Sequence, residues 1–166
     1  MPSLAESPLR ICVVGAGAIG GILAARLSRA GHDVSAIARG PNLAAIQNQG
    51  LTLRSAQETF TVEIAASDAA ADLGVQDYVI ITVKAPALPG LASALTPLLG
   101  PDTAVVTAMN GIPWWFCHAL TGPLAGRTLT ATDPDGKLDN TLGGDRLLGC
   151  VVHVGASMPE PGVVNH

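Results

Sequence analysis

The sequence predicts an α/β fold: a Rossmann-like, doubly wound, mostly parallel sheet with helices on both faces and an antiparallel addition. The first observation is an apolar run at 9–14 that leads into G-x-G-x-x-G and then into apolar residues at helical spacing. The second is a composition of 48% hydrophobic and 13% charged residues, which suits strands covered on both faces. The third is a β-branched run at 77–84, typical of a central parallel strand.

The length and the net charge of the chain limit the classes of protein to which it can belong. The 166 residues fit one domain, preceded by a short leader over 1–8 that we expect to be frayed. A formal net charge of -4 leaves no basic footprint, so we expect no nucleic-acid partner. No apolar run is long enough to span a bilayer, so we expect no membrane partner either. The three cysteines are widely spaced and form no C-x-x-C pair, which indicates a reduced, cytoplasmic setting.

The glycine motif joins a strand over 10–14 to a helix over 18–30. Each glycine has a task in a dinucleotide site: Gly15 permits the tight turn, Gly17 lets a pyrophosphate approach the backbone, and Gly20 allows close packing of helix on strand. The free N–H groups at the start of the helix then attract an anion. The motif therefore predicts dinucleotide binding, and the alternative is an ordinary turn between strand and helix.

The end of the second strand, 32–38, bears on which dinucleotide binds. An NAD site normally places Asp or Glu about 20 residues beyond the glycines, to accept a hydrogen bond from the ribose 2′-OH. Here that place holds Ala38, followed by Arg39. A guanidinium suits a 2′-phosphate, so the sequence favours NADPH. The alternative for Arg39 is a solvated surface arginine.

The later elements follow in order along the chain. We expect a helix over 41–49, an antiparallel strand pair over 51–54 and 59–64, a strand over 77–84, a helix over 86–98, a strand over 103–107 and a helix opening at Trp114.

Two polar side chains follow strands at the edge where ligands bind in open α/β sheets. Lys84 ends the strand over 77–84, and Asn110 follows the strand over 103–107. The alternative for Lys84 is a solvated strand end, and the alternative for Asn110 is a helix cap or a turn residue. Because both lie at the edge that carries the glycine motif, we expect both to line the ligand crevice.

The polar residues in the second half of the chain do not form the pattern of a metal-binding site. The acidic stretch 133–139 lacks the alternate ligands and closing Glu of a calcium loop, so Asp133 is expected to cap a helix or a turn. His118 and His153 have no His or Cys partner at zinc-ligand spacing. Trp114 and Trp115 are open to three interpretations: a helix face, a wall of the crevice, or a contact for a further domain.

Together the motifs resemble the ketopantoate reductase (2-dehydropantoate 2-reductase) family, specifically its N-terminal cofactor-binding domain. The resemblance is carried by Gly15–Gly21, by Ala38–Gly40, by Thr82–Ala85 and by Asn110–Pro113, with the closing strands of that domain at 148–153 and 161–164. It implies NADPH-dependent reduction of an α-keto acid to a 2-hydroxy acid on the route to pantothenate and coenzyme A.

The resemblance also implies residue roles. The pyrophosphate would lie on Gly15, Ala16, Gly17, Ala18, Ile19 and Gly20. Arg39 would hold the 2′-phosphate, Lys84 would lie near the nicotinamide-side ribose and the substrate, and Asn110 would touch both cofactor and substrate. The segment around His153 to Ala156 would run beside the nicotinamide.

Family members continue into a helical second domain that supplies a lysine proton donor, most substrate contacts and a possible homodimer contact. We expect residues 1–166 to be the NADP-binding domain, with that helical domain following and absent here. The leading function is the cofactor half of a keto-acid reductase, inactive alone. The alternative is a non-catalytic NADP(H) sensor or docking module.

Overall fold

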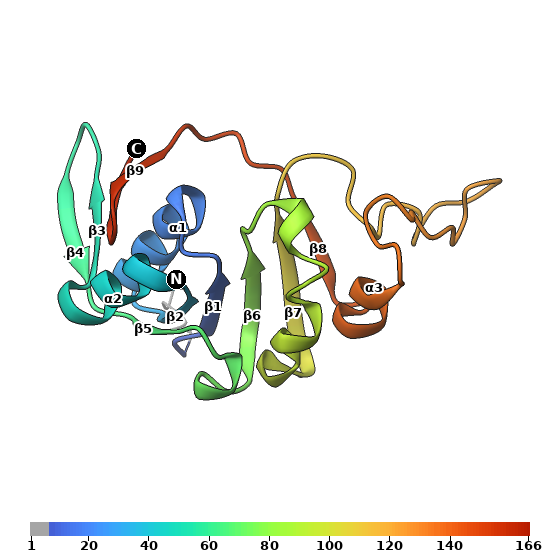
Figure 1. The fold of residues 1–166 in the computed structure, drawn as a ribbon, viewed down its shortest axis with the longest axis horizontal. Coiled ribbons are helices and arrows are strands. Elements are labelled where there is room, and N and C mark those ends of the chain that lie inside the picture. The colour runs from blue at the N-terminus through green and yellow to red at the C-terminus, as the bar shows by residue number, and fades with distance from the viewer. Residues whose placement is uncertain (1–6) are drawn as a thin grey trace, which may run out of the picture.

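Six parallel strands form the central sheet of the computed structural model, which describes residues 7–166 (Figure 1). The strand order is β5-β2-β1-β6-β7-β8. The strands are β1 (Arg10–Val14), β2 (Asp33–Ile37), β5 (Ala65–Ser67), β6 (Gln76–Ile81), β7 (Leu99–Ala108) and β8 (Leu147–Cys150). Because all six run the same way, their carboxyl ends meet at one edge. The predicted Rossmann-like sheet is confirmed.

Both faces of this sheet are covered. Strand β1 shows the division, because Ile11 and Val13 pack into one apolar cluster while Cys12 and Val14 pack into another. Helices α1 (Ala18–Arg29) and α2 (Gly40–Gln49) supply side chains to the first cluster. The 3-10 segment η3 (Ala92–Leu98) and helix α3 (Lys137–Leu142) supply the second.

The antiparallel addition is part of a second sheet of four strands. Strands β3 (Leu51–Arg54) and β4 (Thr59–Val62) form the predicted antiparallel pair. The last strands of the chain, β9 (Ser157–Glu160) and β10 (Val163–Asn165), complete the order β4-β3-β10-β9. Figure 1 shows the final segment leaving β8 and crossing the molecule to reach this sheet.

Helix α1 lies between the two sheets. Its Ile22 and Ala24 share a cluster with Val13 of the central sheet and with Leu53 and Val164 of the second sheet. The contact with β10 is close, since a methyl group on Gly21 would lie 2.5 Å from Cγ2 of Val164. Packing on both sides fixes the start of α1, and that start is the part of the helix nearest the glycine turn.

Two predicted helices are wrong. The helix over 86–98 is replaced by η2 (Ala85–Ala87) and η3, which are short 3-10 segments. Pro86, Pro89 and Pro97 remove backbone donors from this stretch, and Gly90 interrupts it. No helix opens at Trp114, where the chain makes successive turns over 114–119.

The closing strands also differ from the expectation. Strand β8 stops at Cys150, short of His153, and 151–156 is a connecting segment outside any strand. The second closing strand, expected over 161–164, is β10 at Val163–Asn165, which pairs in parallel with β3. The short strand β5 was not foreseen, and residues 1–6 of the expected leader lie outside the described part of the chain. Over 7–166 no helix is both long and apolar enough to cross a membrane.

Candidate functional site

A cleft of about 610 Å³ lies at the carboxyl edge of the central sheet, around the ends of β1, β2 and β6. Its lining combines the glycine turn, the end of β2, and the segment that follows β6. The residues are Val14, Gly15, Ala16, Gly17, Ala18, Ile19, Ile37, Ala38, Arg39, Asn42, Thr82, Val83, Lys84, Ala87 and Leu91.

The three glycines of the motif meet different surroundings. Gly15 has a φ of 99°, and a side chain there would also meet Val83. A methyl group on Gly20 would collide with the carbonyl oxygen of Gly15. A methyl group on Gly17, by contrast, would meet nothing within 4 Å. Gly15 and Gly20 are therefore required by the fold, whereas Gly17 keeps open the space in front of the helix.

The start of α1 faces this open space. Gly17 is the N-cap residue, and no side chain accepts a hydrogen bond from the first turn. The first N–H groups of an α-helix have no acceptor within the helix, so those of Ala18 and Ile19 are left for an anion. This chemistry fits the pyrophosphate of a dinucleotide.

The charge of the cleft is wholly positive. Arg39 and Lys84 are its charged lining residues, and no carboxylate lines it. Arg39 is exposed at the start of α2 and makes no ion pair with any residue in 7–166. Lys84 is also exposed, three residues beyond the end of β6. With Ala38 where an acid would stand, the cleft carries no group that repels a 2′-phosphate.

Asn110 lies beyond the end of β7 but does not line this cleft. Its Nδ2 donates to the carbonyl oxygen of Val152 at 3.0 Å, and its Oδ1 accepts from the Val152 N–H at 2.9 Å. The side chain therefore joins the loop after β7 to the segment after β8. It caps no helix, so its place in the structure is neither the crevice wall nor the cap considered above.

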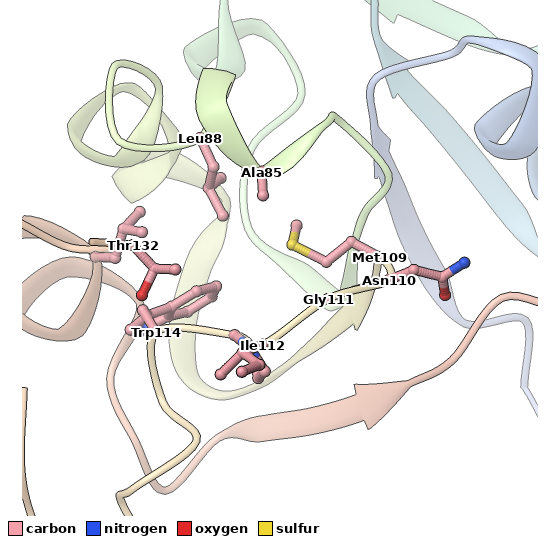
Figure 2. Close-up of a pocket in the computed structure, with 10 residues that line it drawn as sticks. Ala85, Leu88, Met109, Asn110, Gly111, Ile112, Trp114 and Thr132 are labelled. Carbon is pink, nitrogen blue, oxygen red and sulfur yellow. The ribbon is translucent and has the colours of Figure 1, made fainter. Parts of the chain in front are cut away.

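Asn110 borders a smaller, largely apolar pocket under the loop that follows β7 (Figure 2). Leu88, Met109, Ile112 and Trp114 line it, and the carboxamide of Asn110 points away from its centre (Figure 2). Trp114 is buried in the cluster below the sheet and forms a wall of this pocket. Trp114 does not line the main cleft, so it is a core residue at the wall of this small pocket and not a wall of the ligand crevice.

Ala156 stands apart from the main cleft. It is half-buried in the segment that leads to β9, and it packs against the cluster around α1 together with Val154 and Met158. Of the ten residues singled out from the sequence, seven line the main cleft. Gly20 is buried in α1 behind the glycine turn, while Asn110 and Ala156 belong to the neighbouring loops.

The roles of two polar cleft residues, Thr82 and Asn42, were missed by sequence reasoning. The Thr82 hydroxyl donates to the carbonyl oxygens of Gly15 at 2.7 Å and Val14 at 3.1 Å, which ties the end of β6 to the glycine turn. Asn42, in the first turn of α2, donates to the carbonyl oxygen of Ala16 at 2.7 Å. A polar residue near the start of a helix after β2 is too common a pattern to reveal this contact.

The remaining polar features are structural. The Asp133 carboxylate accepts from the N–H groups of Leu138 and Asp139 at 3.0 and 3.1 Å, so it binds the first turn of α3, although the N-cap residue is Gly136 and not Asp133. Burial raises the pKa of the Cys12 thiol to about 11, which keeps it protonated and unsuited to act as a nucleophile. The described part of the chain contains no cluster of three His, Cys, Asp or Glu side chains placed to hold a metal ion.

The chain matches known proteins in sequence. A family model described as Ketopantoate reductase PanE/ApbA matches residues 11–115. A 2-dehydropantoate 2-reductase of Mesorhizobium japonicum is 43% identical over 159 residues, which are 95% of this chain and 49% of that protein. The uncharacterized oxidoreductase YkpB of Bacillus subtilis is 30% identical over 105 residues, which are 62% of this chain and 34% of that protein.

Solved structures of the same family resemble this chain in fold. A ketopantoate reductase family protein from Ralstonia solanacearum is 48% identical with a TM-score of 0.91, covering 96% of this chain and 50% of its own. A PanE/ApbA family ketopantoate reductase from Ralstonia eutropha is 28% identical with a TM-score of 0.72, covering 95% and 46%. The chain thus spans about half the length of these relatives. By sequence and by fold, it belongs to the ketopantoate reductase family.

Proposed function

We propose that this chain is the cofactor-binding half of an NADPH-dependent reductase that converts an α-keto acid, 2-dehydropantoate, to its 2-hydroxy acid. The observation that carries the proposal is the main cleft. Its floor offers the free N–H groups of a helix start, and its charged lining residues are the cations Arg39 and Lys84. A ligand with a pyrophosphate and a 2′-phosphate matches both features.

The residues present suggest a distribution of roles. The turn from Gly15 to Gly20 holds the pyrophosphate, and Arg39 holds the 2′-phosphate. Lys84 lies three residues past the end of β6, where its ammonium neutralises the ribose-phosphate side of the ligand or a substrate carboxylate. NADPH, when bound, supplies the hydride that reduces the keto group.

Asn110 has a more restricted role in this proposal. Both ends of its carboxamide are bound to Val152, so a contact with cofactor or substrate requires it to give up one of those bonds. Without that exchange, Asn110 acts on the site by holding the segment that contains Ala156. Either way, the loops after β7 and β8 form the second wall at which a keto acid would be presented.

Nucleotide titration tests the proposal. Trp114 lines the small pocket on the loop after β7, so its fluorescence reports events at that edge of the sheet. NADPH is expected to change this fluorescence saturably and to bind more tightly than NADH. Equal affinity for NADPH and NADH would contradict the assignment of Arg39. The absence of binding by either would contradict the cofactor role, including that of a non-catalytic NADP(H) sensor.

A further inference from the structure

The carbonyl oxygens of Gly15, Ala16 and Gly17 are all bound, so none is left unpaired beside the free N–H groups at the start of α1. The Gly15 oxygen accepts from the Gly17 N–H and from the Thr82 hydroxyl, both at 2.7 Å. The Gly17 oxygen accepts from the Gly21 N–H at 2.7 Å. The carbonyl between them, that of Ala16, has the Nδ2 group of Asn42 as its donor, at 2.7 Å.

The orientation of the Asn42 carboxamide follows from its two partners. The Gly162 N–H can only donate, and it lies 2.9 Å from Oδ1 of Asn42. The Ala16 carbonyl can only accept, so it requires the Nδ2 end. One half-buried side chain on α2 therefore connects the glycine turn with the turn between β9 and β10.

The Ala16 carbonyl and the Gly17 N–H belong to one planar peptide group, in which they point in opposite directions. On its other side the peptide is held by the Gly17 N–H, which donates to the Gly15 carbonyl oxygen at 2.7 Å. Gly17 has no side chain to restrain it further, so without Asn42 that one bond would hold the peptide and the Ala16 carbonyl oxygen would be free to leave its position. Asn42 opposes this movement because its amide binds that oxygen.

We propose that Asn42 is a positioning residue for the pyrophosphate of the dinucleotide: it locks the Ala16–Gly17 peptide so that the turn keeps its carbonyl oxygens away from the ligand. The inference rests on the proposed function for the identity of the ligand. It assigns Asn42 no direct contact with the 2′-phosphate or with the reacting atoms. Its effect is therefore confined to ligands that carry the pyrophosphate.

Two substitutions and a control separate this role from a general effect on folding. Asn42→Ala removes the lock. Asn42→Asp keeps the acceptor for Gly162 but faces the Ala16 carbonyl with a carboxylate oxygen and adds negative charge to the cleft. Gln47→Ala is the matched control, because Gln47 lies on the same helix and donates to the carbonyl oxygen of Ala66 at 2.9 Å, outside the cleft.

Calorimetric titration with NADPH, NADH and adenosine 2′-monophosphate tests the lock, with urea unfolding as the check on stability. Asn42→Ala is expected to weaken NADPH and NADH alike by about tenfold, the scale of one hydrogen bond, and Asn42→Asp by more. Adenosine 2′-monophosphate, which lacks the pyrophosphate, should bind Asn42→Ala as it binds the wild type. Gln47→Ala should leave all three affinities unchanged.

Each contrary result has a distinct meaning. Wild-type affinity for NADPH in both Asn42 variants overturns this role of Asn42, as does a loss of adenosine 2′-monophosphate affinity in Asn42→Ala equal to the loss of NADPH affinity. If the wild-type chain binds no nucleotide, the proposed function fails. The role of Asn42 is then tested by NMR relaxation dispersion at the Gly17 amide. Asn42→Ala should introduce conformational exchange there that the wild type and Gln47→Ala lack.

Discussion

The carboxamide of Asn110 holds the backbone of Val152 at both its N–H and its carbonyl oxygen, at 2.9 and 3.0 Å. These residues lie 42 positions apart, on the loops that follow two neighbouring parallel strands. The pair fixes the 151–156 segment, which belongs to no strand and is otherwise held by its partly buried side chains and by a contact between Nδ1 of His166 and the Gly155 carbonyl oxygen at 3.2 Å.

This pair gives a prediction that needs no ligand. Asn110→Ala should increase amide hydrogen exchange at Val152 by about two- to tenfold, because its N–H loses an acceptor worth roughly 0.5–1.5 kcal/mol. Asn110→Asp keeps that acceptor and should stay close to the wild-type rate. Mass-spectrometric exchange over 150–156 measures both. Unchanged exchange in Asn110→Ala would show that the pair does not hold the segment in solution.

The second prediction concerns Arg39 and the choice of cofactor. Arg39→Ala should weaken NADPH binding by about 1.5–3 kcal/mol, the scale of a hydrogen bond to a charged group, and leave NADH nearly unchanged. Arg54→Ala is the control, because Arg54 is an exposed arginine that pairs with Glu160 and does not line the cleft. Equal weakening of the two cofactors would mean that Arg39 does not bind the 2′-phosphate.

The third prediction separates two glycines of one motif. Gly17→Ala should cost only about 1 kcal/mol of folding stability, as expected at an N-cap, yet reduce NADPH affinity strongly because the methyl group occupies the space of the pyrophosphate. Gly20→Ala should lower stability by about 1–3 kcal/mol or more, because its methyl group collides with the Gly15 carbonyl.

Urea unfolding and NADPH titration of the same samples test this contrast. If Gly17→Ala binds NADPH as the wild type does, the pyrophosphate does not lie against the start of α1.

The predicted strands and the glycine turn follow from local rules, and so they could be derived from the sequence. The strand over 10–14 and the helix after it are confirmed because burial and helical spacing agree there. The prediction of a helix over 86–98 was wrong because Pro86, Pro89 and Pro97 deprive the backbone of hydrogen-bond donors. That error was avoidable from the sequence.

Other features depend on contacts between distant segments. Nothing local in Val163–Asn165 indicates that it pairs in parallel with β3 rather than joining the central sheet. The same holds for Asn42 and for Asn110, whose amides bind residues 120 and 42 positions away. The residue types at the cleft were predictable from motif spacing, but these carboxamide contacts join distant segments and emerge only in the folded structure.

The last prediction concerns turnover by residues 1–166 alone. The chain contains two lysines: Lys84, beside the cleft, and Lys137, which pairs with Asp135 at 3.4 Å at the start of α3. Resemblance to the family places the proton-donating lysine and most substrate contacts in a helical domain. The chain spans 49% of the length of a curated relative, so we expect it to bind NADPH but not to reduce 2-dehydropantoate at a useful rate.

Two physical losses support this expectation. Without a general acid the rate falls by about 10²–10⁴. Without groups that position the keto acid, much of a proximity contribution of roughly 7–11 kcal/mol is also lost. Lys84 and Asn110 offer at most a few hydrogen bonds, each worth about 1.5–3 kcal/mol even when one partner is charged. They therefore recover only part of the lost transition-state stabilisation. The measurement is steady-state NADPH oxidation with 2-dehydropantoate. NADPH binding by the same sample is the control. Robust turnover by this chain would show that residues 1–166 carry the whole chemistry.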